Sequence, residues 1–93
     1  MAELFLPAIE EARVPVLDRG FIFGDGVYEY IPVYQRKPFR AGPHFARLAR
    51  SLDAIGIPNP YSDAEWNTIL ATLIAKQSFD DQGVYFQVTR GVA

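Results

Sequence analysis

The chain has 93 residues, 49% hydrophobic and 14% aromatic, so it can bury one modest core and form at most one domain. A net charge of −2, with scattered lysines and arginines, argues against nucleic-acid binding. The chain has no cysteine, which excludes disulfides and cysteine-based zinc sites, and its single histidine excludes His-pair metal motifs. Because no signal peptide and no apolar run near ~20 residues is found, we expect a soluble protein with no membrane partner. The lack of cysteine leaves the compartment open and fits a reducing, cytoplasmic location.

In chain order, the first predicted elements are two short strands, residues 4–6 and residues 14–17, which could form a hairpin. Pro15 would place the second strand at an edge or a strand end. Residues 24–26, Gly-Asp-Gly, predict a tight turn whose glycines permit positive φ. The apolar residues 27–34 that follow predict a long strand.

Alternation along this strand sorts its side chains onto two faces. Tyr28 and Tyr30 point to one face, and Val27, Glu29 and Ile31 point to the other. One face therefore offers phenol hydroxyls and the other a carboxylate. From the residues alone, two interpretations stay open: one wall of a substrate site, or a structural turn with two tyrosines half-buried by their rings.

A helix is predicted after this strand. Pro32 lacks a ladder donor and predicts a free edge, a bulge or a bend, and residues 35–38 then turn the chain. The helix begins near Pro43 and ends at Gly56. Its apolar stripe, which should pack on the sheet, consists of Phe45, Leu48, Leu52 and Ile55.

Three charged or titratable residues lie on this helix. Arg47 and Arg50 share a flank of the stripe, and spacing alone favours a solvated pair. His44, in the first turn, is more often exposed or a packing residue in such a position, and no chemistry is assigned to it.

A second helix and a last strand complete the pattern. Ser62 and Glu65 fit a capping box at the start of the helix. Residues 80–83 predict a turn, and residues 84–89 predict a strand. The helix has a core stripe of Trp66, Ile69, Leu70, Leu73 and Ile74. The sequence therefore predicts an α+β fold, a small domain with a mainly antiparallel sheet and two packed helices.

Three motifs occur in one order: Asp-Arg-Gly-Phe-Ile-Phe-Gly-Asp-Gly-Val-Tyr-Glu at residues 18–29, His-Phe-Ala-Arg-Leu at residues 44–48, and Tyr-Phe-Gln-Val-Thr-Arg-Gly at residues 85–91. Together they resemble the amino-terminal domain of class IV, pyridoxal-phosphate-dependent aminotransferases. The likeness is greatest to D-amino acid (D-alanine) aminotransferases, because the Tyr-Glu-Tyr of residues 28–30 differs from the usual motifs of branched-chain L-aminotransferases and aminodeoxychorismate lyases.

The resemblance implies a transaminase that moves an amino group between a D-amino acid such as D-alanine and a 2-oxo acid, with pyridoxal 5'-phosphate as cofactor. By this likeness Arg47 binds the cofactor phosphate, and its guanidinium fork suits two phosphate oxygens. Tyr28 would donate its hydroxyl to the substrate carboxylate, and Tyr30 would line the same pocket. Glu29 has the wrong charge for a carboxylate contact, so we expect it to orient neighbouring donors.

The family's catalytic lysine has no match here. Lys37 lies in a turn and Lys76 near a helix end. We therefore expect residues 1–93 to be the amino-terminal small domain of a longer enzyme, a truncated chain that holds no catalytic residue and is inactive alone. The resemblance also implies a homodimer. The alternatives are a non-catalytic binding or interaction domain, or a fragment of a class IV lyase or a branched-chain L-aminotransferase.

Overall fold

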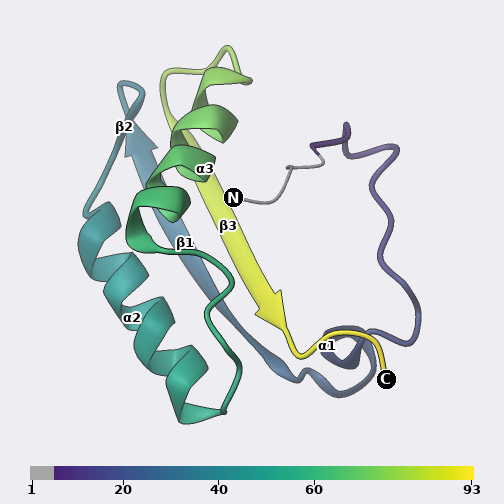
Figure 1. Ribbon diagram of the computed structural model, residues 1–93. Coiled ribbons are helices and arrows are strands. Elements are labelled where there is room, and N and C mark those ends of the chain that lie inside the picture. Colours follow the sequence, from purple (N-terminus) through teal and green to yellow (C-terminus); the bar gives the residue numbers. More distant parts are fainter. Residues whose placement is uncertain (1–5) are drawn as a thin grey trace.

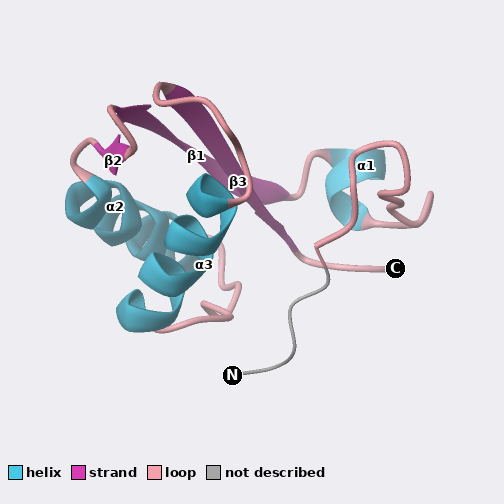
Figure 2. Ribbon diagram, turned by 90° about the horizontal axis from the view of Figure 1, so that it is seen from above, coloured by secondary structure: helices cyan, strands magenta, loops and turns pink. Residues whose placement is uncertain are grey.

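A computed structural model describes residues 6–93 and shows a three-stranded antiparallel sheet with two helices packed on one face. The strand order is β2-β1-β3, and β1 lies in the middle. Both long helices lie on the same side of the sheet, and the short α1 lies near the start of β1 and the end of β3 (Figures 1 and 2). The predicted α+β fold is confirmed. The elements are α1 (Arg19–Phe23), β1 (Gly26–Tyr34), β2 (Lys37–Pro38), α2 (Ala41–Ala54), α3 (Asp63–Ala75) and β3 (Gln82–Thr89).

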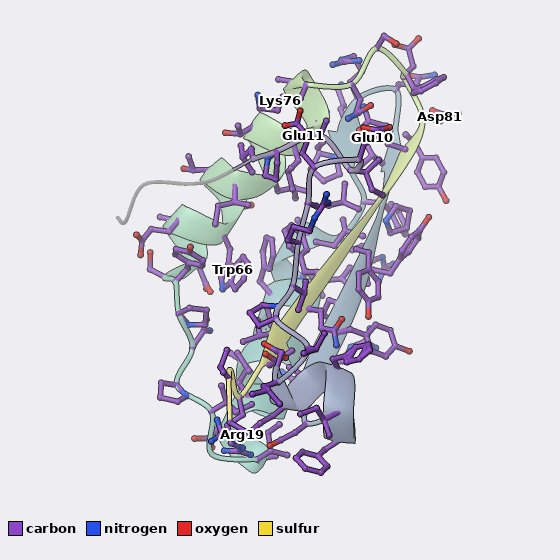
Figure 3. The ribbon with its side chains drawn as sticks, turned by 90° about the vertical axis from the view of Figure 1, so that its right-hand side faces the viewer. Glu10, Glu11, Arg19, Trp66, Lys76 and Asp81 are labelled. Carbon is purple, nitrogen blue, oxygen red and sulfur yellow. The ribbon has the colours of Figure 1, made fainter. Side chains whose placement is uncertain are left out.

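The core lies between the sheet and the two long helices. Ile31 pairs with Val84 across β1 and β3, and both side chains are buried on the helical face. Trp66 lies between α3 and the sheet (Figure 3), with its ring 5.4 Å from that of Phe86. Its indole Nε1 donates to the Asn59 side chain at 2.9 Å, which satisfies its polar atom. Trp66 is thus a core residue, as predicted.

The helix signals of the sequence are confirmed with one exception. The capping box of α3 is present, because Glu65 N donates to Ser62 Oγ at 3.2 Å and Ser62 N donates to Glu65 Oε1 at 3.1 Å. The stripe of α2 is buried at Phe45, Leu48 and Leu52. Ile55 was wrongly placed in that stripe: it caps the helix and is 38% exposed. Ile57 is buried instead, because Gly56 adopts φ 71° and turns the chain back.

The start of the chain differs from the predicted hairpin. Residues 4 and 5 lie outside the described residues, and Leu6 and residues 14–17 form no strand. The five-residue helix α1 was not predicted; Asp18 begins it by accepting a hydrogen bond from Gly20 N at 2.8 Å. Gly24 ends it with φ 65°, as a left-handed glycine cap. The second glycine of the predicted turn, Gly26, begins β1 without a positive φ.

The turn between β1 and β2 is tied to the end of α3. Gln35 and Arg36 both have positive φ, 49° and 63°, as a two-residue hairpin requires. Arg36 Nη2 donates to the carbonyls of Ile74 and Gln77 at 2.9 Å each, so its guanidinium caps the last turn of α3. Pro32 lies in the central strand, but its carbonyl accepts from Phe39 N, so its missing donor falls on the side where only the short β2 pairs.

Candidate functional site

The strand β1 and the helix α2 bring three side chains of the predicted motifs together. The Glu29 carboxylate is 2% exposed. Arg47 donates from Nε to Glu29 Oε2 at 2.7 Å and from Nη2 to Oε1 at 2.8 Å. His44 Nδ1 lies 2.8 Å from the same Oε1. The expectation that Glu29 orients neighbouring donors agrees with these contacts.

The electrostatics of this cluster favour ionised groups. The pKa of Glu29 lies below its ordinary value, chiefly because Arg47 donates to the carboxylate and secondarily because His44 does; burial acts in the opposite direction. The pKa of Arg47 is raised, mainly by its hydrogen bond to Glu29. Arg47 nevertheless leaves 61% of its side chain exposed, and its Nη1 makes no hydrogen bond within residues 6–93. A buried carboxylate thus holds an exposed guanidinium that can still donate.

The two predicted substrate tyrosines lie on the opposite face of the sheet from the helices. Tyr28 is 65% exposed and Tyr30 is 52% exposed, so the predicted alternation is correct. The Tyr28 ring stacks on Tyr85 of β3, with centroids 5.6 Å apart. Gln87, which pairs with Tyr28, lies on the same exposed face.

Arg47 and the tyrosines are therefore separated by the sheet but share one edge of it. Along this edge β1 pairs with β2 only at Val33 and Tyr34, so residues 26–31 have no strand on that side in the described part of the chain. A ligand at this free edge could approach Arg47 on one face and Tyr28 on the other.

The first and third motifs interlock where β1 begins and β3 ends. Thr89 Oγ1 donates to Asp18 Oδ2 at 3.1 Å. Arg90 donates to both carboxylate oxygens of Asp25, at 2.6 and 3.2 Å, and this contact lowers the pKa of Asp25. Arg19 Nη1 donates to the carbonyl of Val92 at 2.9 Å. These motif residues fix the start of β1 against the end of β3, a role that sequence reasoning did not identify.

Sequence reasoning also missed two contacts of α2. His44 was given no role, although its ring contacts Glu29. Arg50 was expected to be solvated; it is exposed, but it lines the same surface hollow as Arg47. The available signal was spacing, since residues 44 and 47 lie one helical turn apart on α2 and can reach the same partner. In the structure that partner is Glu29 of β1.

Among residues 6–93 no group of three or more His, Cys, Asp or Glu side chains is arranged to hold a metal ion. None of the helices in that range is long and apolar enough to cross a membrane.

Comparison with known proteins decides the family. A sequence model described as "Amino-transferase class IV" matches residues 26–93. The chain belongs to the class IV aminotransferase family. Among curated class IV proteins, D-alanine aminotransferase from Staphylococcus epidermidis is 40% identical over 84 residues, which cover 90% of this chain and 30% of that protein.

Solved class IV structures share the fold. A fold IV transaminase from Curtobacterium pusillum matches with a TM-score of 0.85 and 27% identity, over 95% of this chain and 32% of that one. A 4-amino-4-deoxychorismate lyase from Pseudomonas aeruginosa matches with a TM-score of 0.75 and 31% identity, over 94% and 30%. The branched-chain aminotransferase of Escherichia coli matches with a TM-score of 0.82 and 25% identity, over 89% and 29%. The chain thus spans about a third of the length of its class IV relatives.

Proposed function

We propose that these 93 residues are the amino-terminal domain of a pyridoxal-phosphate-dependent transaminase that exchanges an amino group between a D-amino acid, D-alanine in the first instance, and a 2-oxo acid. The observation that carries the proposal is the buried Glu29 holding an exposed Arg47 within a chain 40% identical to a D-alanine aminotransferase. The Tyr28-Glu29-Tyr30 order supports the D-amino acid branch over the lyase and branched-chain neighbours.

The donor set around Arg47 fits a phosphate group. A phosphate dianion needs charged donors that are held in place before it arrives. Glu29 immobilises Nε and Nη2 of Arg47, and Nη1 is left to donate outward. When bound, pyridoxal phosphate supplies the electron-accepting ring on which amino groups are exchanged. The part of Arg47 in this reaction is to anchor the cofactor.

The exposed tyrosines would orient the substrate. The Tyr28 hydroxyl can donate to a carboxylate, and its ring is held by stacking on Tyr85. Tyr30 stands two residues further along the same face and would border the amino acid side chain. Both rings come from a strand that is paired with β3 along most of its length, which would fix their positions relative to a substrate.

The lysine that such an enzyme needs is proposed to come from outside these 93 residues. Lys37 lies in the exposed β2, and Lys76 caps α3 at the end shown in Figure 3. Neither lies on α2 or on the tyrosine-bearing part of β1. The 93 residues alone should therefore not transaminate. Borohydride reduction of the cofactor-loaded whole protein, followed by peptide mass spectrometry, would contradict this proposal by finding the adduct on Lys37 or Lys76.

A homodimer is also proposed. Several apolar side chains are exposed around α1 and the segment before it, and such a patch favours burial against another surface. The residues are Val14, Val16, Leu17, Phe21 and Phe23. Sedimentation equilibrium of the whole protein should give twice the chain mass, and a monomer at micromolar concentration would contradict the proposal.

The activity is tested on the whole protein with pyridoxal phosphate. D-alanine and 2-oxoglutarate should give pyruvate, and L-alanine under the same conditions should give far less. The control amino donor is L-leucine, and the control lyase substrate is 4-amino-4-deoxychorismate. Turnover of either control without D-alanine turnover would overturn the proposed substrate class.

A further inference from the structure

Two arginines differ from all the others in residues 6–93. Arg40 and Arg50 donate no hydrogen bond and form no ion pair within that range; Arg40 only lies over the Phe39 ring, at 5.4 Å. Each remaining arginine donates to a carbonyl or a carboxylate: Arg13, Arg19, Arg36, Arg47 and Arg90. The two unpaired guanidinium groups line the same hollow.

This hollow runs along α2 from its N-cap and has a volume of about 230 Å³. Its lining consists of Arg40, Pro43, His44, Arg47 and Arg50. No carboxylate lines it. Glu29, the acid that bonds to two of its lining residues, is buried and already accepts from Arg47 and His44. Three guanidinium groups thus border one concave site. Among them, Arg47 alone forms an ion pair within residues 6–93, and its partner is Glu29.

The backbone at Arg40 has a conformation that is uncommon for an arginine. Arg40 has φ 57° and ψ 43°, the left-handed region that suits glycine or asparagine. It also occupies the N-cap of α2 without making a side-chain cap, where Ser, Thr, Asp or Asn would stabilise the helix. Departures of this kind concentrate at functional sites, because function rather than stability selects the residue.

We propose that Arg40 and Arg50, together with Arg47, form a binding site for an oxyanion of the phosphate type. Guanidinium groups suit this ligand because each can donate two parallel hydrogen bonds to its oxygens. A dianion would also relieve the repulsion among like charges in the hollow. Its source is either the cofactor's phosphate group or a free phosphate. The inference shares Arg47 with the proposed function, and only the first source rests on that function.

The test measures binding of inorganic phosphate to the whole protein by calorimetry at constant ionic strength, first without and then with saturating pyridoxal phosphate. The variants are Arg40→Gln, Arg50→Gln and Arg47→Gln. The matched control is Arg13→Gln, which removes the same charge from an exposed arginine that bonds only to its own neighbours in sequence. Arg40→Gln and Arg50→Gln should each weaken phosphate binding roughly threefold to tenfold, and Arg13→Gln should leave it unchanged.

The cofactor arm identifies the source. Phosphate excluded by bound pyridoxal phosphate makes the hollow part of the cofactor site, and phosphate that still binds makes it a separate site. Undetectable phosphate binding, or equal binding by the Arg40, Arg50 and Arg13 variants, overturns the inference. If Arg47→Gln alone weakens cofactor binding, the proposed function stands without this site. If Arg40→Gln and Arg50→Gln weaken phosphate binding while Arg47→Gln leaves cofactor binding intact, the site stands and the cofactor assignment fails.

Discussion

The Glu29 carboxylate accepts two hydrogen bonds from Arg47, at 2.7 and 2.8 Å, and joins the middle of β1 to the middle of α2. The acid is buried and the base is largely exposed. The Nε and Nη2 atoms of the guanidinium are held by the carboxylate, and the remaining donors face solvent. A neutral substitution at Glu29 should therefore release Arg47 from this fixed position.

Glu29→Gln should lower both stability and cofactor affinity. An amide cannot accept from Nε and Nη2 as a charged pair of oxygens does, and Arg47 would lose its fixed orientation. Because Arg47 can be resolvated, we expect a loss of about 1–2 kcal/mol in the free energy of unfolding, measured by urea denaturation. Glu11→Gln, at an exposed carboxylate, is the matched control and should change little. Equal stability of the two variants would show that the pair contributes nothing.

The same pair predicts a pH dependence. The folded pKa of Glu29 lies below its unfolded value, so its contribution to stability is present above the unfolded pKa. It is lost as the pH falls through the folded pKa. The difference in unfolding free energy between the native protein and Glu29→Gln should therefore shrink on acidification below about pH 4.5, the ordinary value for a glutamate. Asp25 titrates in the same direction, but it is common to both proteins and cancels in the difference. A constant or growing difference would contradict this account.

Arg36→Ala should destabilise the end of α3. The guanidinium donates to the carbonyl of Ile74 in the last turn of α3 and to those of Gln77 and Phe79 just after it. We expect a loss of about 1–3 kcal/mol in urea denaturation, the range for hydrogen bonds that involve a charged group. Lys37→Ala, the exposed neighbour in β2, is the control. Faster amide exchange near residues 74–77 in Arg36→Ala alone would locate the effect.

Two glycine substitutions should act in opposite directions. A Cβ at Gly20 would clash with Thr89 Cγ2, so Gly20→Ala must displace the contact between α1 and β3 and destabilise the protein. A Cβ at Gly42 meets no atom within 4 Å beyond its two chain neighbours, and the residue lies inside the first turn of α2. Gly42→Ala should therefore stabilise, but by less than the roughly 1 kcal/mol of an ordinary helix position, because the following Pro43 disfavours helical backbone at a residue with a Cβ. Thermal melting of both variants checks the pair, and an increase in stability for Gly20→Ala would refute the interlock of the two motifs.

Tyr28→Phe should reduce turnover of D-alanine while leaving cofactor binding intact. Only the hydroxyl is removed, and the stacked ring on Tyr85 remains. A raised KM would indicate lost carboxylate binding, and a lowered kcat would indicate a role in the transition state. Tyr34→Phe, at an exposed ring that packs on Phe39 near the hairpin, is the control. Unchanged kinetics of Tyr28→Phe would remove this residue from the site.

Much of this arrangement follows from the sequence, because its signals are local. Alternation places Glu29 inward and Tyr28 outward, and both placements are correct. The helix α1 was missed because five residues with a glycine have weak propensity; contacts of Asp18 with Gly20 and Thr89 hold it. Residues 14–17 resemble a strand in composition, but no neighbouring strand pairs with them in the described chain.

The missed contacts are those that depend on distant parts of the chain. Arg36 donates to the end of α3 from the turn between β1 and β2, a contact between residues far apart in sequence. Its positive φ, which orients it there, is seen only in the structure. Arg50 is related to Arg47 because both side chains line the same hollow on α2. Charge on a helix flank is usually solvated, so spacing alone could not distinguish this pair from a solvated one.

The central claim is that Arg47, held by Glu29, anchors the cofactor phosphate. The most direct measurement is the dissociation constant of pyridoxal phosphate for Arg47→Ala, compared with the native whole protein and with Arg13→Ala. We predict at least about tenfold weaker binding for Arg47→Ala, as for loss of a hydrogen bond to a charged group, and native affinity for Arg13→Ala. Native affinity for both variants would contradict the assignment of Arg47.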